Sequence, residues 1–183
     1  MIKLHNITKS FNDDLVLSDF SFHFYPNEKY LIIGESGIGK TTLLNIIMGL
    51  QKPDEGFVDC FCTFSCSFQQ TRLLEKYTVI ENLKIISNKE NLEEIISHLL
   101  GQEFIHKPVY SLSGGQKQKV SIIRALISNS DCVILDEPFN GLDERNIELC
   151  INYILDNLKG RTLIISSHIT QQLKPHKFIT INL

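Results

Sequence analysis

The sequence predicts an α/β fold with a mainly parallel sheet core, a small antiparallel β part and a helical subdomain. Three short apolar runs have the length and composition of buried parallel strands. They are Tyr30–Ile33, Cys132–Leu135 and Thr162–Ile165. Patterns with helical periodicity alternate with these runs, and strands that alternate with helices are typical of a parallel sheet.

Alternating apolar residues near the N-terminus predict the antiparallel strands. Ile2 and Leu4 alternate with polar residues, as do the three phenylalanines within 20–24, and this period of two is typical of half-buried strands. Leucine and isoleucine at helical spacing then predict a helix from Thr41 to Leu50. Residues 56–68 are rich in Phe, Val and Cys and predict one strand or a tight hairpin.

The character of the sequence becomes helical between about residues 71 and 112. Thr78 and Glu81 form a capping-box pattern before one helix, and a second apolar pattern ends at Gly101. Further helices are expected at 114–128 and 143–158, and a last strand at 178–181. We expect a single domain over residues 1–183, with a helical subdomain at about 71–128.

Composition and charge restrict the class of protein. Apolar residues make up 43% of the chain and charged residues 21%, which are ordinary values for a globular domain. The net charge of −3 is weak and mixed along the chain, so we expect no nucleic-acid partner. No signal peptide is recognisable, and no apolar run approaches the ~18 residues of a membrane span. We expect a cytoplasmic protein with reduced cysteines.

The segment GESGIGKTT fits the pattern G-x-x-x-x-G-K-[ST] between an apolar strand and an amphipathic helix. Its residues are Gly34, Glu35, Ser36, Gly37, Ile38, Gly39, Lys40, Thr41 and Thr42. Glycines let backbone N–H groups approach phosphate oxygens, and the next helix points its positive end at the same phosphates. We expect Lys40 to bind the β- and γ-phosphates of a nucleotide and Thr41 to bind Mg²⁺.

Two carboxylates follow the apolar strand at 132–135. Ligands of open α/β sheets bind at the carboxyl ends of the strands, where Asp136 and Glu137 stand. Asp136 can hold Mg²⁺ through water, and Glu137 is placed to orient or deprotonate an attacking water. Taken alone, such a pair is a solvated strand end about as often as it is part of a functional site. Combined with the glycine-rich loop, it predicts nucleotide hydrolysis.

The sequence LSGGQ separates this chain from other phosphate-loop proteins. Its residues are Leu112, Ser113, Gly114, Gly115 and Gln116. Together with the loop and the carboxylates, it makes the chain resemble the nucleotide-binding subunit of ATP-binding cassette (ABC) transporters, a P-loop NTPase fold. The segments on either side of Gln69 are short for that family, so we expect a minimal form. Ser113 is an N-cap, and the bare N–H groups behind it would bind an anion.

The resemblance implies that this anion is the γ-phosphate of ATP held by a partner subunit, and it implies roles for further residues. Gln69 resembles the glutamine that senses Mg²⁺ and water, and His168 the histidine that contacts the γ-phosphate. With Lys40 and Glu137 these residues would form the catalytic set. Asp143 resembles the aspartate that crosses the dimer interface, and it also fits a helix N-cap. Phe11 stands where an aromatic ring stacks on adenine, although it equally fits a core position.

The resemblance also implies partners and a location. Two cassettes, as a homodimer or heterodimer, would close around ATP and Mg²⁺ and drive separate transmembrane permease subunits from the inner face of the cell membrane. TRLLEKYTV and DEPFNGLD are similar to forms in importers of small organic anions. Import of a small solute, with an extracytoplasmic solute-binding protein as a further partner, is the first hypothesis. The alternatives are a lipoprotein-release, cell-division or peptide-export complex, and a soluble ABC ATPase without a transport role.

Three of the five cysteines lie in FVDCFCTFSCSFQQ, at Cys60, Cys62 and Cys66. In one continuous strand these residues and Phe64 would share a face, where cysteine serves as a small buried hydrophobic residue. Neighbours on one strand face do not converge on a tetrahedral centre. A packing role is therefore favoured over a metal or redox role.

Overall fold

The computed structural model describes residues 1–12 and 14–183, and a five-stranded parallel sheet lies at the centre of the protein. The strand order is β5-β6-β7-β3-β8, and every pairing between neighbours is parallel. The bounds are Lys29–Ile33 for β3, Phe64–Ser67 for β5, Cys132–Asp136 for β6, Thr162–Ser166 for β7 and Ile179–Asn182 for β8. The predicted α/β fold with a mainly parallel sheet is confirmed.

A second, antiparallel sheet has the order β2-β1-β4. Its strands are β1 (Ile2–Phe11), β2 (Asp14–Phe24) and β4 (Glu55–Cys60). The alternation seen in the sequence sets its faces, because Ile2 and Leu4 are almost completely buried while their neighbour Lys3 is only partly covered. The expected antiparallel β part is therefore present.

Five α-helices complete the described part of the chain, with 3₁₀ turns at 102–104, 109–111 and 174–176. They are α1 (Lys40–Ile47), α2 (Val79–Lys84), α3 (Leu92–Leu99), α4 (Gly114–Ile127) and α5 (Glu144–Asn157). The capping box at the start of α2 is confirmed, because Glu81 N donates to Thr78 Oγ1 and Thr78 N donates to Glu81 Oε2. Among the described residues, none of the helices is both long enough and apolar enough to cross a bilayer.

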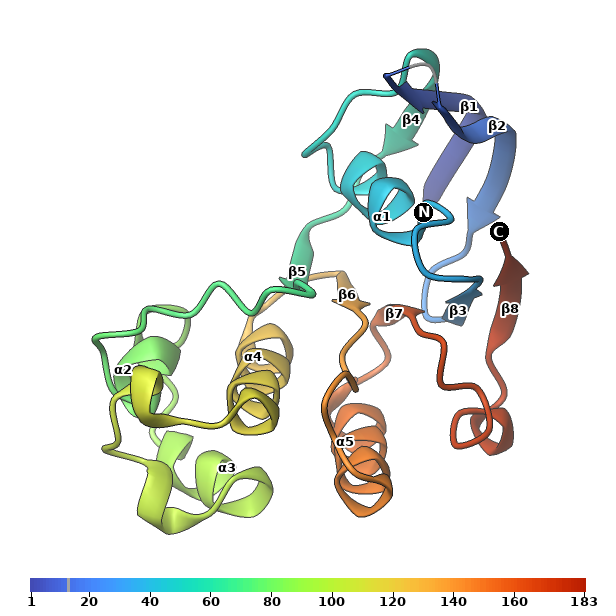
Figure 1. Ribbon diagram of the computed structural model, residues 1–183. Coiled ribbons are helices and arrows are strands. Elements are labelled where there is room, and N and C mark those ends of the chain that lie inside the picture. Colours follow the sequence, from blue (N-terminus) through green and yellow to red (C-terminus); the bar gives the residue numbers. More distant parts are fainter. Residues whose placement is uncertain (13) are drawn as a thin grey trace.

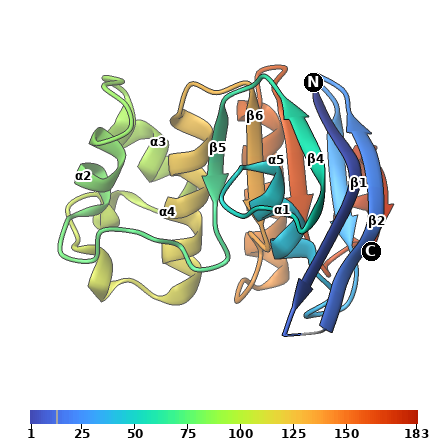
Figure 2. The same cartoon turned by 90° about the horizontal axis from the view of Figure 1, so that it is seen from above.

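The parallel sheet separates two hydrophobic cores, because successive strand residues face opposite sides. Tyr30 and Ile32 of β3 pack with α1 and the antiparallel sheet, whereas Leu31 packs on the side of α4 and α5. Figure 1 shows α1 on one side of the strands and α4 and α5 on the other. The helices α2 and α3 lie beyond α4, on the side away from β1 and β2 (Figure 2).

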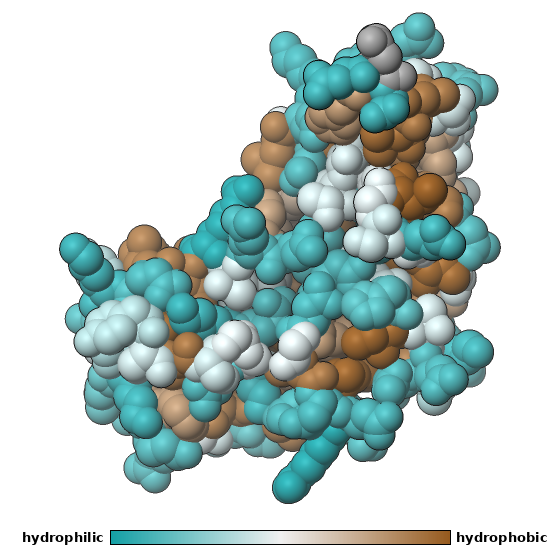
Figure 3. Space-filling model, viewed as in Figure 1, coloured by the Kyte–Doolittle hydropathy of each residue, from teal (hydrophilic) through white to brown (hydrophobic). Residues whose placement is uncertain are grey.

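The protein therefore has two arms that meet at the parallel sheet. The antiparallel arm consists of β1, β2, β4 and α1, and the helical arm consists of α2, α3 and α4 (Figure 1). Figure 3 shows that the angle between the two arms is open to solvent and that its floor is largely hydrophilic. Polar groups therefore lie at this open angle.

The prediction for residues 56–68 was wrong, because they form neither one strand nor a hairpin. The strand β4 ends at Cys60 and pairs with β1, while β5 begins at Phe64 and pairs with β6. The two strands therefore belong to different sheets, and residues 61–63 connect them. A strand's partner can be remote in sequence, so local alternation could not reveal this change of sheet.

The cysteines consequently do not share one strand face. Cys60 is the last residue of β4 and Cys62 lies within the connector, with their Sγ atoms 3.3 Å apart. Burial together with the Cys60 contact raises the pKa of the Cys62 thiol to about 12. Both thiols and Cys66 pack against the core on the α1 side, which is the packing role expected for them. Within residues 1–12 and 14–183, no group of three or more His, Cys, Asp or Glu side chains could hold a metal ion.

Two glycines with positive φ differ in how much space surrounds them. Gly49 (φ 70°) and Gly56 (φ 82°) are both left-handed, but an added Cβ at Gly49 meets nothing within 4 Å. At Gly56 it would lie 2.1 Å from the backbone oxygen of His5. We expect Gly49→Ala to cost about 1 kcal/mol and Gly56→Ala at least about 3 kcal/mol of unfolding free energy. Urea unfolding followed by circular dichroism measures both, and equal losses would contradict the close approach of β4 to β1.

Candidate functional site

The predicted site residues follow the carboxyl ends of neighbouring parallel strands. The Gly34–Thr42 loop follows β3, and Gln69 and His168 follow β5 and β7. Asp136 is the last residue of β6, and Glu137 comes directly after it. The strands are in register, because Ile32 pairs with Ser166 and Ser166 pairs with Asp136. The segments that leave these strands are therefore level with one another, at the edge where open α/β sheets bind ligands.

The glycine-rich loop curls around its own lysine. Lys40 Nζ donates to the backbone oxygens of Gly34 and Glu35, each at 2.9 Å, and the residue is buried. Gly37 and Gly39 have φ values of 85° and 115°, which favour glycine strongly. The backbone can therefore turn tightly enough to leave its N–H groups beside the lysine.

A hydroxyl from the loop meets a carboxylate from β6. Thr41 Oγ1 donates to Asp136 Oδ2 at 2.8 Å, and Ser166 Oγ donates to the other oxygen, Asp136 Oδ1. Asp136 is only 3% exposed. Hydroxyl and carboxylate oxygens are the hard ligands that Mg²⁺ takes in proteins, so these side chains fit that ion.

Glu137 lies between a lysine and a histidine. Its Oε1 is 3.3 Å from Lys40 Nζ, and its Oε2 is 3.0 Å from His168 Nδ1. The backbone N–H of Glu137 is held by the backbone oxygen and the hydroxyl of Ser166, and φ is 47°, a left-handed value that is strained for a non-glycine residue. Strain of this kind concentrates at functional sites because the surrounding structure must enforce it.

A small cavity of about 130 Å³ joins these groups. Its lining residues are Ser36, Gly37, Gly39, Lys40, Thr41, Thr42, Gln69 and Glu137. Gln69 is exposed and comes from β5, on the far side of β6 and β7 from the loop. The structure thus brings together segments that follow four different strands. Asp136 and His168 do not line the cavity themselves, but Asp136 is hydrogen-bonded to Thr41 and His168 to Glu137, which do.

The LSGGQ segment lies at a second and larger cavity, of about 670 Å³. Ser113 caps α4, since Gln116 N donates to Ser113 Oγ and Ser113 N donates to Gln116 Oε1. The cavity is lined by Ser113–Lys119, Asn140–Asp143 and Gln69, but by no residue of the Gly34–Thr42 loop. Leu112 is buried in the core, so its side chain faces away from this cavity.

Phe11 lies apart from both cavities. It is 45% exposed at the end of β1, and the ammonium group of Lys9 lies 5.5 Å from the centre of its ring. Phe11 is therefore available at the surface of the antiparallel arm and is not a core residue. Its stacking on adenine stays a prediction.

Ser166 and Asn146 were missed by sequence reasoning. Ser166 orients both carboxylate residues, and Asn146 holds Asp143, to which it donates from its backbone and side-chain nitrogens at 2.9 and 2.8 Å. The signal for Ser166 was present as polar residues that end an apolar strand just before His168. Asn146 carries no such signal, because many helices have an asparagine in the first turn.

The fold and the site define a P-loop nucleotide-binding domain, and comparison with known proteins identifies its family. Residues 17–140 match the ABC transporter family, so the chain belongs to that family and is an ABC transporter ATP-binding subunit. The family binds ATP, and its members hydrolyse it. The recognition of an ABC cassette from the loop, the carboxylates and LSGGQ is confirmed.

Three similar proteins illustrate the relation. The lipoprotein-releasing system ATP-binding protein LolD of Bacteroides thetaiotaomicron is 36% identical, over 92% of this chain and 90% of its own. The spermidine/putrescine import ATP-binding protein PotA of Acetivibrio thermocellus is 33% identical over 78% of this chain, which spans only 46% of that relative. A solved dimeric ATP-binding cassette in a post-hydrolysis state, bound to ADP and Pi, has a TM-score of 0.81 and 28% identity, over 94% of this chain and 90% of its own.

The hydrogen bonds from Asn146 lower the pKa of Asp143 below its ordinary value of 3.8. The cap is therefore fully formed above pH 3.8 and weakens as the pH falls through the lowered value. Asn146→Ala removes the side-chain hydrogen bond but keeps the backbone N–H bond, which is the larger cause, so we expect the pKa of Asp143 to return only part of the way towards 3.8, measured from carboxyl chemical shifts. Asn152→Ala, at an exposed position on the same helix, should leave this pKa unchanged. The same Asp143 pKa in Asn146→Ala and in the wild type would show that the Asn146 side chain does not contribute to lowering it.

Proposed function

We propose that this chain hydrolyses ATP at the Gly34–Thr42 loop, dimerises on ATP and drives separate transmembrane permease subunits. The observation that carries the proposal is the position of Glu137, in contact with Lys40 on one side and with His168 on the other. A buried carboxylate beside a phosphate-loop lysine is the arrangement that a base for an attacking water requires.

Nucleotide binding would exploit the contacts that Lys40 already makes. Its ammonium group donates to two carbonyl oxygens and lies near the Glu137 carboxylate. Phosphate oxygens are also hydrogen-bond acceptors, so they would replace these oxygens as partners of the lysine. The backbone N–H groups of the loop and the N-terminus of α1 add to this attraction. Thr41, Asp136 and Gln69 would hold Mg²⁺, which when bound offsets the charge of the phosphates.

Hydrolysis of ATP would begin when Lys40 binds phosphate and no longer contacts Glu137. Once the lysine binds phosphate, Glu137 Oε1 is free to accept a proton from water, whose oxygen attacks the γ-phosphorus as the bond to the ADP oxygen breaks. His168 holds the other carboxylate oxygen at 3.0 Å and so orients the base. The side chain of His168 is 60% exposed, which leaves it able to contact the γ-phosphate as well.

A second cassette would complete the site. The N–H groups behind Ser113 belong to the larger cavity, which contains no residue of this chain's own phosphate loop. They are therefore available to the γ-phosphate on a partner chain, and Asp143 at the same cavity would cross the interface. Because each half-site lacks these donors until the partner arrives, ATP binding and dimer closure would be coupled. The similarity to a dimeric cassette bound to ADP and Pi supports this arrangement.

The remaining assignments concern the whole assembly. We propose one cassette domain at residues 1–183, with a helical subdomain at about 71–128 that contacts the permease at the inner face of the membrane. Import of a small solute is the first candidate, supported by the similarity to PotA, an import ATP-binding protein. Lipoprotein release is the second candidate, favoured by the similarity to LolD over nearly the full length of both chains.

The genes beside the coding sequence separate the two candidates. A multi-span permease gene together with a gene for an extracytoplasmic solute-binding protein would support import. A permease gene without a binding protein would support the second candidate and contradict import.

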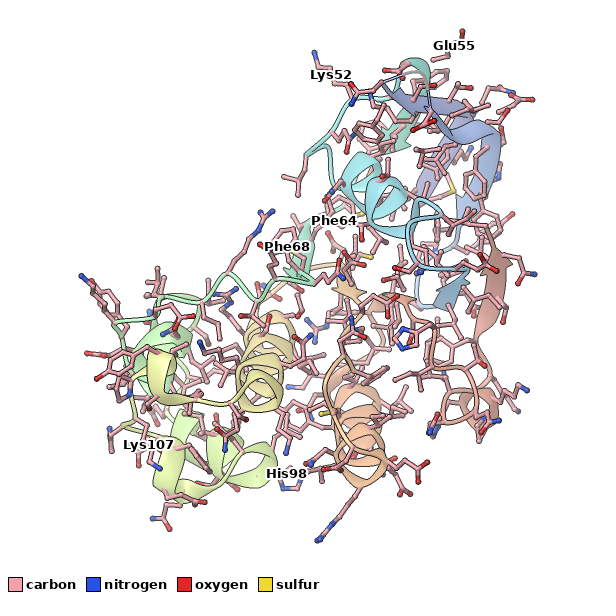
Figure 4. All side chains as sticks on the ribbon, in the orientation of Figure 1. Lys52, Glu55, Phe64, Phe68, His98 and Lys107 are labelled. Carbon is pink, nitrogen blue, oxygen red and sulfur yellow. The ribbon has the colours of Figure 1, made fainter. Side chains whose placement is uncertain are left out.

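Removal of the loop lysine tests nucleotide binding. We expect Lys40→Ala to weaken ATP binding at least about 30-fold, because charge-assisted hydrogen bonds to phosphate are lost. Isothermal titration calorimetry measures the affinity, and Lys52→Ala is the matched control, since Lys52 is exposed far from the site (Figure 4). Unchanged ATP affinity in Lys40→Ala would overturn the assignment of the loop.

Removal of the proposed base tests the composite site. We expect Glu137→Gln to lower kcat at least about 100-fold while ATP binding persists, because the amide cannot accept the proton of water. The variant should accumulate as a dimer with ATP and Mg²⁺ and as a monomer with ADP, measured by light scattering after size exclusion. A variant that stays monomeric with ATP would contradict the two-chain site.

A further inference from the structure

We propose that Gln118 is a positioning residue for Gln69: its amide hydrogen-bonds the Gln69–Thr71 segment when Gln69 engages the nucleotide site. This bond would link nucleotide binding to α4, the helix that begins at Ser113. The inference rests on the proposed function of Gln69 and adds a residue to which no role has been assigned.

The first observation is an unsatisfied amide. Gln118 is only 4% exposed, and its Nε2 is the one fully buried side-chain nitrogen or oxygen without a hydrogen-bond partner in the part of the chain that the structure describes. A buried amide without a partner destabilises a protein, so native structures rarely keep one without a functional reason. Gln118 therefore has a donor for which the fold, as the structure has it, supplies no acceptor.

The second observation is what Gln118 faces. It lines the larger cavity together with Gln69 and Thr71, and the same cavity is bounded by the first turn of α4. Gln69 also lines the small cavity beside Lys40 and Glu137. Gln69 thus lines both cavities, and Gln118 is a buried polar side chain on its α4 side.

The third observation is that α4 already holds this segment on both sides of Gln69. Before it, Ser121 Oγ and Ser67 Oγ form a buried hydrogen bond of 2.7 Å. After it, Arg124 donates to the backbone oxygens of Thr71 and Arg72 at 2.9 and 3.0 Å.

The segment is further braced at its ends. Arg72 has a left-handed φ of 45°, and its guanidinium group lies 3.9 Å from the centre of the Phe68 ring, at the point where the chain leaves β5 (Figure 4). Residues 69 and 70 are exposed between these anchors. Gln118, Ser121 and Arg124 are spaced by three along α4 and so face the same segment.

In this proposal the Gln69–Thr71 segment has two arrangements. When Gln69 moves towards the nucleotide and its ion, a carbonyl oxygen of residues 69–71 can turn into the larger cavity and accept from Gln118 Nε2. The bond would then exist only in the nucleotide-bound state, so it would favour that state and stiffen α4 behind Ser113. Binding of ATP to the chain's own loop would not depend on it.

The test uses the full chain and the variant Gln118→Met, which keeps the length of the side chain and removes its donor. Without nucleotide, the midpoint of thermal unfolding should rise by about 2–4 °C, because an unpaired buried amide is gone. The KM for ATP should stay within about twofold, while kcat falls roughly tenfold. A residue with a purely structural role would not lower kcat while stabilising the fold. Gln118→Leu should behave in the same way.

Two matched variants serve as controls. Asn82 is equally buried, but its amide is paired with Leu74 and Thr78, so Asn82→Leu should lower the unfolding midpoint. Gln102→Met, at an exposed position, should change neither stability nor kcat.

The outcomes separate the inference from the function on which it rests. A wild-type chain that hydrolyses ATP, with an unchanged kcat in Gln118→Met and Gln118→Leu, would overturn the inference alone. A lower unfolding midpoint in both variants would also overturn it, because the amide would then be paired without nucleotide. A wild-type chain that neither binds nor hydrolyses ATP would overturn the proposed function and this inference together.

Discussion

The site depends on the register of three parallel strands, whose carboxyl ends are aligned. Because Ile32, Ser166 and Asp136 are paired across β3, β7 and β6, the segments that leave these strands meet at one edge. Ser166 lies in the middle strand and reaches both the Asp136 carboxylate and the backbone of Glu137. A shift of one residue in any of these strands would turn its side chains to the other face and separate the lysine from the carboxylates.

Groups whose interactions are incomplete or strained lie at the two cavities. Glu137 has a left-handed backbone, Gln118 has an unpaired buried amide, and the N–H groups behind Ser113 open onto a cavity. The left-handed backbone of Glu137 and the unpaired amide of Gln118 each cost stability. In the proposed function the γ-phosphate on a partner chain would bind the N–H groups behind Ser113, and in the further inference the Gln69–Thr71 segment would accept from Gln118. Both contacts would favour the nucleotide-bound state.

Much of the fold could be predicted because its signals are short-range. The capping boxes at Thr78 and Ser113 join residues three positions apart, and the glycine-rich loop is a local motif between a strand and a helix. The connector after Cys60 was predicted wrongly, since β4 and β5 follow each other in sequence and yet pair with strands of two different sheets. Likewise the exposure of Phe11 depends on which strand face is covered, and alternation alone does not show that.

Residue patterns along the chain were sufficient to specify the α/β class, the phosphate loop, the carboxylate pair and the LSGGQ segment, because each is a local arrangement of backbone and side chains. Only tertiary structure decided how far apart these pieces lie and which of them meet. It placed Glu137 between Lys40 and His168, and it placed the LSGGQ segment at a separate cavity away from its own loop. Distances between remote segments follow from strand order and register, which depend on the packing of the whole chain.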